Sequence, residues 1–414
     1  MSYAKSVFFI PVWYDAFAPF TKALAADLRW TYTDTKKHWA QYLYKYASGI
    51  GKNAGLFASF TLKNPSALNV YLFADKIAAA NPPVIEDVRL SCFATGVGFM
   101  EFWVSYDGAS AEDVAEFSYY FKKAKPNPKT IPEGYRALYS VAEDLLPDGR
   151  EATLFFSASA WMKYECNCFH FLHLDQEEPS DEDLRATVYR LSRSYLSTMP
   201  AATDSAYDMM YRAGEGDYWG GSAEGLVNVT YDSPTDRDAK SDYYLHTLKP
   251  QQLQTSYYFM YLLLLNQKYT AIEYIRKVSE SLDSPTKEVE SLNRRIIQLK
   301  NTFSFNVISD DSVVQNIYAK MYGMLEIRNL LEDVIENESQ MAMLQKAKQM
   351  EADRFSSKCL FGLSILSIFS ALIDAASYFD RFSGIRPAAT VMSILCVLLV
   401  TTLCIVLGVR SMRK

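Results

Sequence analysis

The sequence is poor in the residue types that most often carry catalytic chemistry. Histidine occurs four times in 414 residues, and no Ser-His-Asp, Cys-His or paired-carboxylate motif can be assigned from the spacing of residues. We therefore expect that the protein is not an enzyme. The six cysteines are spread over the chain and imply no disulfide framework: Cys92, Cys166, Cys168, Cys359, Cys396 and Cys404.

An excess of positive charge is also missing. The chain holds 42 Lys and Arg against 48 Asp and Glu, a formal net charge of −6. The last 56 residues contain five cations and two acids, so the preceding 358 residues carry a net charge of −9. Non-specific nucleic-acid binding depends on clustered Lys and Arg that neutralise phosphates. The acidic body therefore argues against a polynucleotide partner, whereas a small nucleotide remains a candidate ligand.

The N-terminal region lacks the features of a secretory signal. Its first apolar run, residues 7–13, is too short for a signal core and contains Pro11. We expect this run to form the first strand and the bulk of the protein to be cytoplasmic.

Two long apolar segments lie near the C-terminus. Residues 359–379 contain one formally charged side chain, Asp374, and residues 387–409 contain none. Each segment exceeds the roughly 20 residues that a helix needs to cross about 30 Å of hydrocarbon. Because only residues 380–386 join them, the pattern predicts a transmembrane hairpin with both flanks on the same side.

The distribution of cations predicts the orientation of this hairpin. Cations border its two outer ends, at Arg354, Lys358, Arg410, Arg413 and Lys414, and the connecting loop holds only Arg381 and Arg386. The positive-inside rule places the N-terminal body and the C-terminus in the cytoplasm. We expect a multi-pass protein of the cell inner membrane.

The first predicted span carries a stripe of small and polar residues. Steps of 3, 4, 3 and 4 place on one helix face Ser364, Ser367, Ala371, Asp374 and Tyr378. A carboxylate in hydrocarbon usually faces a bundle interior or water, and two spans cannot enclose a pore. The stripe therefore predicts a homo-oligomer whose first spans line a pore. Close packing between small residues and a plain membrane anchor are the alternatives.

Helices are expected between the body and the membrane. Residues 251–282 contain an apolar run at 257–265 that is too short to span a bilayer, which predicts a buried helix. A second helix is expected to begin at Ser284-Pro285. Its apolar face repeats at steps of 3 and 4: Val289, Leu292, Ile296, Leu299 and Phe303.

A very long helix is expected next. No proline occurs from Asp310 to Phe379, which predicts about 70 residues of continuous helix, on the order of 100 Å long. Its inner face is expected at Val314, Ile317, Met321, Met324, Leu331 and Ile335. We interpret residues 251–358 as a helical lever and stalk, and residues 359–414 as the transmembrane hairpin.

Residues 1–250 mix β-rich runs with amphipathic helices, which favours an α+β protein with a cytoplasmic α/β sensor domain. Residues 88–106 are predicted to form paired strands, followed by a helix that begins at Ser110. Residues 152–175 are again predicted to be extended, followed by a helix that begins at Ser180. These stretches indicate a ββα repeat about 70 residues apart.

One predicted strand combines cysteine with histidine. Cys166, Cys168 and His170 fall on one face of it, and that face is otherwise largely apolar. Consecutive residues on one face of a strand lie about 6–7 Å apart, too far for zinc bonds of about 2.0–2.3 Å unless the strand breaks. We interpret these residues as buried small side chains, with metal binding as the alternative.

Residues 214–225 are rich in glycine but match neither the dinucleotide fingerprint nor a P-loop. A hairpin between strands is one interpretation. The other is a ligand loop, in which the backbone at Gly220 and Gly221 approaches a phosphate or carboxylate while Tyr218 and Trp219 stack on a ring. Arg212 and Arg237 would then be the charge partners.

The order of an N-terminal α/β body, a helical lever, a long stalk helix and two C-terminal spans resembles the CorA family of divalent-cation channels. Residues 257–379 carry most of the likeness. The resemblance implies a homopentamer whose first span lines the pore. The family's Gly-Met-Asn signature is missing, because the outer end of the first span reads Tyr378-Phe379-Asp380. Magnesium selectivity is therefore not implied.

The combination is similar to the CorA-type proteins found with type III CRISPR systems. That resemblance implies antiviral membrane disruption, or a channel, gated by an adenine-nucleotide messenger such as an S-adenosylmethionine-AMP conjugate. It transfers no ligand residue to this sequence. A CorA-type magnesium or cobalt transporter, with a divalent cation as ligand, is the alternative, and an anchored scaffold without conduction is a third hypothesis.

Overall fold

The computed structural model describes residues 3–33, 42–79, 81–122, 131–147, 152–155, 166–199, 209–232, 242–280, 292, 294–380 and 398. The chain divides into two compact units, Met1–Ile335 and Glu336–Lys414. Residues 251–335, predicted as part of the lever, thus belong to the same unit as the N-terminal body. The predicted boundaries at residues 250 and 358 stay predictions.

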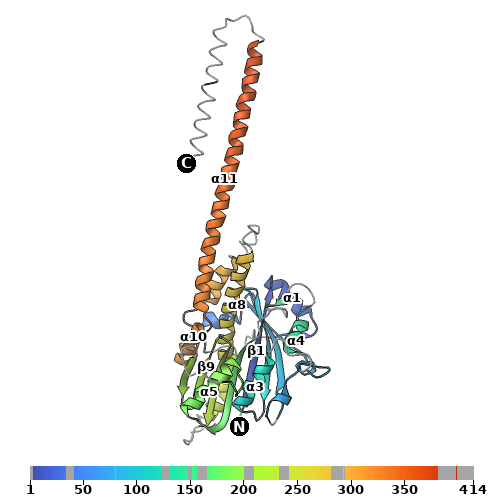
Figure 1. Ribbon diagram of the computed structural model, residues 1–414, viewed down its shortest axis with the longest axis vertical. Helices are drawn as coiled ribbons and strands as arrows, with labels where there is room; N and C mark the ends of the chain where they lie inside the picture. The colour runs from blue at the N-terminus through green and yellow to red at the C-terminus, as the bar shows by residue number, and fades with distance from the viewer. Residues whose placement is uncertain are drawn as a thin grey trace. The chain divides into compact units, whose positions relative to one another are not determined.

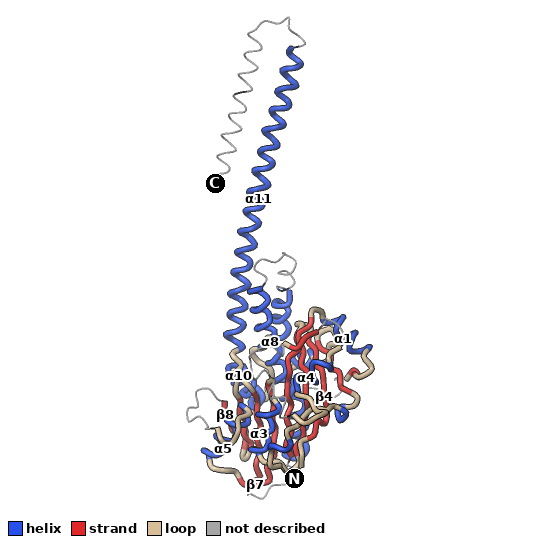
Figure 2. Tube along the Cα trace, turned by 45° about the vertical axis from the view of Figure 1, so that its right-hand side comes forward, coloured by secondary structure: helices blue, strands red, loops and turns tan. Residues whose placement is uncertain are grey.

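The described strands form one ten-stranded sheet (Figure 2). They are β1 (Tyr3–Tyr14), β2 (Trp30–Tyr32), β3 (Phe57–Leu62), β4 (Val84–Phe93), β5 (Val97–Tyr106), β6 (Ala152–Leu154), β7 (Asn167–Glu177), β8 (Met209–Gly214), β9 (Asp217–Gly221) and β10 (Gly225–Asp232). Their order is β2-β3-β4-β5-β1-β7-β10-β9-β8, and β6 pairs with one end of β1. All pairs are antiparallel except β7 with β10. The mixed sheet and its helices confirm the predicted α+β class.

The helices of the N-terminal half cover or edge the sheet. They are α1 (Phe17–Ala26), α2 (Lys45–Ile50), α3 (Ala111–Phe121), α4 (Leu138–Leu145) and α5 (Asp181–Arg193), with 3₁₀ turns η1 (Pro65–Ala67) and η2 (Ala74–Lys76). The later helices are α7 (Lys249–Gln252), α8 (Tyr258–Glu280), α10 (Ser312–Met324) and α11 (Ile327–Asp380), with π-helical turns η5 (Tyr244–Leu248), η6 (Leu253–Tyr257) and η7 (Leu299–Phe303).

Strand β1 lies in the middle of the sheet and is buried on both faces, as its continuous apolar run predicts. Phe8 packs edge-on against Phe121 of α3, whereas Phe9 packs against Tyr258 and Tyr261 of α8. Successive side chains of a strand point to opposite faces. Helices α3 and α5 therefore cover one face and α8 covers the other, which gives three layers in this unit (Figure 1).

The first predicted ββα stretch is confirmed, with β4 paired to β5. The second is confirmed only in part, because β6 and β7 each pair with β1 and residues 156–165 lie outside the described residues. Strands β4 and β5 lead into α3, where Ser110 and Asp113 form a reciprocal capping box. Strands β6 and β7 lead into α5, where the Ser180 side chain accepts a hydrogen bond from the Asp183 N–H. In each case a serine cap followed by acidic residues determines where the helix begins.

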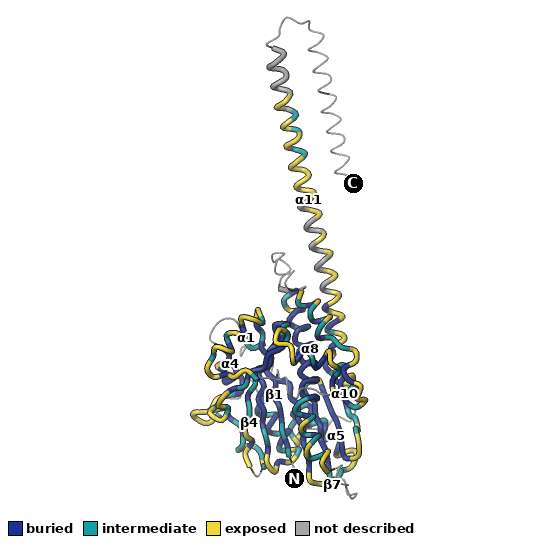
Figure 3. The backbone as a smooth tube through the Cα atoms, turned by 180° about the vertical axis from the view of Figure 1, so that it is seen from behind, coloured by how far each residue is buried: buried dark blue, intermediate teal, exposed yellow. Residues whose placement is uncertain are grey.

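The buried helix predicted from the sequence is confirmed in η6 and α8, where residues 257–265 are all buried (Figure 3). Polar groups interrupt its apolar contact with the sheet. Hydrogen bonds join helix to sheet from Tyr258 to Glu101 at 2.6 Å, from Tyr269 to Asn167 at 2.6 Å, and from Thr95 to Asn266 at 2.8 Å. A one-turn slip of α8 would leave these buried groups without partners.

The prediction of one continuous helix from Asp310 is wrong. Helix α10 ends at Met324, Glu326 adopts a left-handed φ of 54°, and α11 begins at Ile327. The Glu326 N–H donates to the carbonyl of Gly323 at 3.0 Å. Because neither proline nor glycine occupies positions 325 and 326, no local signal marks the break.

The break changes which residues of the second helix face inward. Leu325 and Ile327 on either side of it are both buried. On one unbroken helix, residues two apart point to roughly opposite sides, so the break allows both to pack against the same body. The predicted inner face is therefore confirmed at Leu331, which is buried. It is wrong at Ile335, which is 49% exposed, because Val334 is buried in its place.

Within the described part of the chain, no helix combines the length and the apolar character needed to cross a bilayer. The residues of the first predicted span belong to α11. The second predicted span, 387–409, and the loop at 381–386 lie outside the described residues, apart from residue 398. The transmembrane hairpin stays a prediction.

Two adjacent glycines in β9 allow close packing on both faces of the sheet. A Cβ atom at Gly220 would lie 1.9 Å from Cγ1 of Val188 on α5, and one at Gly221 would lie 2.2 Å from Sδ of Met321 on α10. Both distances are far below a van der Waals contact, so the helices occupy the space that side chains would need.

Replacing Gly220 by alanine is expected to destabilise the protein. The added methyl group collides with Val188, so the free energy of unfolding should fall by about 1–3 kcal/mol. Gly214 is the matched control, because a Cβ atom there meets no atom within 4 Å; its alanine variant should change stability by less than about 0.5 kcal/mol. Urea unfolding of both variants would measure the difference, and equal values would contradict the packing described above.

Candidate functional site

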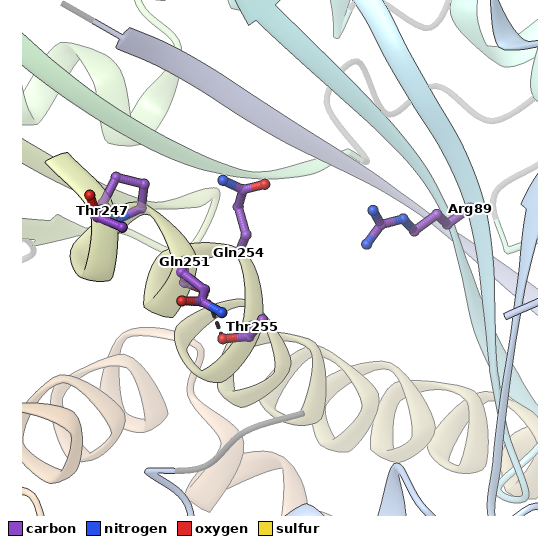
Figure 4. A pocket seen from close by; sticks show the side chains of 6 residues that line it. Arg89, Thr247, Gln251, Gln254 and Thr255 are labelled. Carbon is purple, nitrogen blue, oxygen red and sulfur yellow. Dashed lines mark hydrogen bonds between the residues drawn. The ribbon is translucent and has the colours of Figure 1, made fainter. Parts of the chain in front are cut away.

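A pocket of about 420 Å³ lies between β4 and the helical segment that precedes α8 (Figure 4). Six residues line it, and all but Pro250 have polar side chains: Arg89, Thr247, Pro250, Gln251, Gln254 and Thr255. Its volume is within the range of about 300–1,000 Å³ typical of small-molecule sites. The pocket is therefore the candidate binding site of the N-terminal unit.

Arg89 is the only charged residue in this lining, and its neighbours hold it in place. Its Nε donates to Oδ2 of Asp87 at 2.6 Å, and its guanidinium carbon lies 4.3 Å from the ring centre of Trp103. Among the described residues, its two terminal nitrogens have no hydrogen-bond partner. Figure 4 shows the guanidinium pointing from β4 across the pocket toward Gln254. A fixed guanidinium with free donors is suited to bind a phosphate or carboxylate.

A buried carboxyl group lies beneath Arg89. Glu101 of β5 is the cross-strand partner of Arg89, and its Oε2 accepts hydrogen bonds from Tyr258 at 2.6 Å and from Nε1 of Trp103 at 3.3 Å. Its Oε1 is buried with no hydrogen-bond partner. Burial raises the pKa of Glu101, although the hydrogen bond from Tyr258 and the charge of Arg89 oppose the shift. Glu101 thus connects the pocket floor to α8.

The opposite wall consists of the turns η5, α7 and η6. Both π-helical turns are continuous with α helix, and such turns occur often at functional sites. Below them, Lys249 is fully buried and donates a hydrogen bond to Asp217 of β9, and its Nζ lies 5.2 Å from the ring centre of Trp219. This ion pair fixes the wall to the sheet.

The glycine-rich segment forms two strand connections, which confirms the hairpin interpretation. Trp219 is fully buried against Phe169 and Tyr257, and Tyr218 is 3% exposed on the other face of β9. The two rings are therefore not presented together to a ligand, which corrects the expected stacking surface. The reason is the two-residue period of a strand, which sends neighbouring side chains to opposite faces.

The other predicted members of this ligand loop are not brought to one site. Gly220 and Gly221 face α5 and α10, as described above. Arg212 of β8 lies over the ring of Tyr218 at 5.6 Å and 3.8 Å from a Glu178 carboxylate oxygen. Arg237 lies outside the described residues.

The cysteines of β7 are buried, as predicted. Cys166 and Cys168 are no more than 2% exposed, and the Cys168 Sγ lies 3.6 Å from Ser194 Oγ. The Nδ1 of His170 lies 2.6 Å from Ser6 Oγ. Burial, and secondarily the charge of Lys122, lower the pKa of His170 to about 3, so this imidazole is neutral at physiological pH.

The predicted pore stripe lies on α11. Ser364, Ser367 and Ala371 are exposed, and the Ser364 hydroxyl donates to the carbonyl of Leu360 at 2.8 Å. The backbones of Asp374 and Tyr378 are helical, and their side chains lie outside the described part of the structure. The pore-lining role stays a prediction.

Arg89, Gln251 and Gln254 are not among the site residues predicted from the sequence. No motif joins them, because strand register and the packing of a distant helix bring them together. One local signal was present: Arg89 and Glu101 are charged residues within two otherwise apolar strands that were predicted to pair. Such pairs in buried strands point to a polar site beneath the surface.

Replacing Glu101 by glutamine should remove a pH dependence of stability. A carboxyl group whose pKa is raised on folding favours the native state at low pH, and that contribution disappears as pH rises from about 4.5 through the folded pKa. The stability of wild type relative to Glu101→Gln should therefore fall with rising pH, by at most about 1.4 kcal/mol per pH unit. Urea unfolding of wild type and Glu101→Gln across this pH range measures the difference in stability. The control is Glu143→Gln, because Glu143 is exposed. A constant difference would contradict the raised pKa.

Comparison with known proteins adds no family assignment to this geometry. No protein-family model matches the chain, and no curated protein matches it.

Proposed function

We propose that the protein is a ligand-gated membrane channel or membrane-disrupting effector of CorA-like architecture. Its ligand in this proposal is a small adenine nucleotide, of the S-adenosylmethionine-AMP type, bound in the Arg89 pocket. The observation that carries the proposal is the fixed Arg89 guanidinium, whose terminal nitrogens face an amide-rich helical wall. The protein acts by binding and conformational change rather than by catalysis.

The chemistry of the pocket supports an anionic ligand with hydrogen-bonding groups. Arg89 can donate two parallel hydrogen bonds to a phosphate. The amides of Gln251 and Gln254 offer both donors and acceptors, which suits a base edge or a ribose. Arg89 is a single cation in the pocket lining, and the protein as a whole is acidic. Because polynucleotide binding needs many cations, both features favour a small ligand.

The position of the pocket supports a gating role. A ligand there would touch β4 on one side and the turns that continue into α8 on the other. By neutralising Arg89, an anion would remove a charge that lowers the pKa of Glu101, and would thereby alter the hydrogen bond from Tyr258 of α8. Ligand binding shifts a conformational equilibrium only through such a difference in affinity between two states.

The sequence supports the membrane part of the proposal. The residues 359–379 and 387–409 are long enough to form a hairpin, and Asp374 would face the axis of a homo-oligomer, a pentamer by resemblance. Cations border the two ends of the hairpin that lie away from its connecting loop. By the positive-inside rule, they favour cytoplasmic termini at the inner membrane.

Replacing Arg89 by glutamine is expected to weaken nucleotide binding roughly 10- to 150-fold, because charge-assisted hydrogen bonds contribute about 1.5–3 kcal/mol. Calorimetry on the purified full chain with an S-adenosylmethionine-AMP conjugate and with cyclic oligoadenylates measures the affinity. Arg212→Gln, a change of the same type in β8, is the matched control and should bind normally. Weakened binding in Arg212→Gln alone would move the site to the glycine-rich segment, and no binding of any nucleotide would overturn the proposed ligand.

Cation flux in liposomes that hold the full chain tests conduction. We expect flux only with the nucleotide, and we expect Asp374→Ala to alter it whereas the exposed Asp353→Ala leaves it unchanged. Nucleotide-independent flux that magnesium closes from the side of the N-terminal unit would instead establish the divalent-cation transporter. Absence of flux with a nucleotide that binds would establish an anchored scaffold.

A further inference from the structure

Two histidines and an aspartate from three separate elements meet on the α8 side of the sheet. They are His173 of β7, Asp232 at the end of β10 and His246 of the turn η5. One ligand atom from each lies within 4.8 Å of the other two. The rings of His173 and His246 are edge-on, with centroids 4.8 Å apart.

The Nε2 atom of His173 points into this cluster. Nδ1 of His173 lies 2.9 Å from the Thr230 hydroxyl oxygen, and that oxygen lies 3.2 Å from the carbonyl oxygen of Leu172. In the tautomer that carries its proton on Nδ1, Nε2 offers a lone pair to a metal ion. This nitrogen is buried without a hydrogen-bond partner.

Two carboxylates face that lone pair. Nε2 of His173 lies 3.5 Å from Oδ1 of Asp232 and 3.6 Å from Oδ1 of Asp175. A metal ion bound to Nε2 would therefore have a carboxylate oxygen within reach as its next ligand.

The 3.5 Å between Nε2 of His173 and Oδ1 of Asp232 agrees with the distance between two ligands of one metal ion, and the third ligand atom lies within 4.8 Å of both. Ligand atoms about 2.0–2.2 Å from a tetrahedral zinc ion lie about 3.3–3.6 Å from one another. His173 is held rigidly by Thr230 and by the stacked ring of Tyr3 at 5.6 Å. His246 and Asp232 are partly exposed, so their side chains can turn toward the ion.

We propose that His173, His246 and Asp232 bind a zinc ion. Imidazole ligands favour zinc and other late first-row metals, whereas magnesium and calcium prefer sites made of oxygen atoms. Asp242, whose Oδ1 lies 3.4 Å from Nε2 of His246, is placed to orient that ring. The Thr230 hydroxyl has the same role for His173.

The proposed zinc ion would tie β7 and β10 to η5. His246 directly precedes Thr247, which lines the Arg89 pocket. Zinc would therefore fix one wall of that pocket. The site itself does not depend on the proposed nucleotide, since all of its ligands come from outside the pocket lining.

Zinc titration of the full chain, purified without a polyhistidine tag and stripped of metal, tests the site. Competition with a chromophoric zinc indicator should give one zinc ion per chain, and excess magnesium should not displace it. Loss of an outer partner of a metal ligand typically weakens binding about 10- to 100-fold, so we expect that range for Thr230→Val. His246→Gln and Asp232→Asn should lose at least as much.

Asp144→Asn is the control, because Asp144 is an exposed carboxylate that pairs with Arg136. Cobalt in place of zinc should give visible absorption bands of nitrogen and oxygen coordination that disappear in His246→Gln. Circular dichroism without metal establishes that each variant is folded. If His246→Gln is unfolded, Asp232→Asn replaces it as the test variant. No stoichiometric zinc binding, or the same affinity in the folded variants as in Asp144→Asn, would overturn the proposal.

Discussion

The contact between α8 and the sheet is the constraint on which the rest of the N-terminal unit depends. Nine consecutive buried residues supply its apolar area, but apolar contact alone would allow the helix to slide. The buried hydrogen bonds to Glu101, Asn167 and Thr95 fix one register. Each bond contributes only about 0.5–1.5 kcal/mol, whereas leaving its buried groups unpaired costs about 1–3 kcal/mol. The helix therefore keeps this register mainly because any other register would leave buried polar groups unpaired.

That register determines where the polar chemistry lies. Once Tyr258 is bonded to Glu101, the turns before α8 must pass over β4, and Gln254 faces Arg89. Lys249 reaches Asp217 in the same layer. His246, one residue before the pocket lining begins, then meets His173. The pocket and the proposed zinc site are thus two results of one docking geometry, on the same face of the sheet.

Much of the fold could be predicted from sequence because its signals are local. Serine caps at Ser110 and Ser180 and the apolar run at 257–265 identified elements that the structure confirms. The break at Glu326 could not be predicted, because it satisfies the burial of Leu325 and Ile327 rather than a local preference. A left-handed φ at a glutamate is an outcome of tertiary packing.

The site residues were harder to predict for a similar reason. Arg89 and Glu101 are neighbours only through strand register, and His173, Asp232 and His246 are far apart in sequence. The error over Tyr218 and Trp219 is different, since strand alternation alone separates those rings. Because neighbouring side chains of a strand point to opposite faces, a strand in the glycine-rich segment already implies that Tyr218 and Trp219 are separated. This alternation favours the hairpin from the sequence alone.

Gly220 and Gly221 make the three-layer unit thin at one place. Each lacks the side chain that would hold a helix away from the strand, so α5 on one face and α10 on the other approach the same two residues of β9. Packed interiors are hard to compress. A displacement of α5 would therefore reach α10 through a single strand, and α10 directly precedes the break before α11. Strand β9 thus mechanically connects α5 on one face of the sheet with α10 on the other.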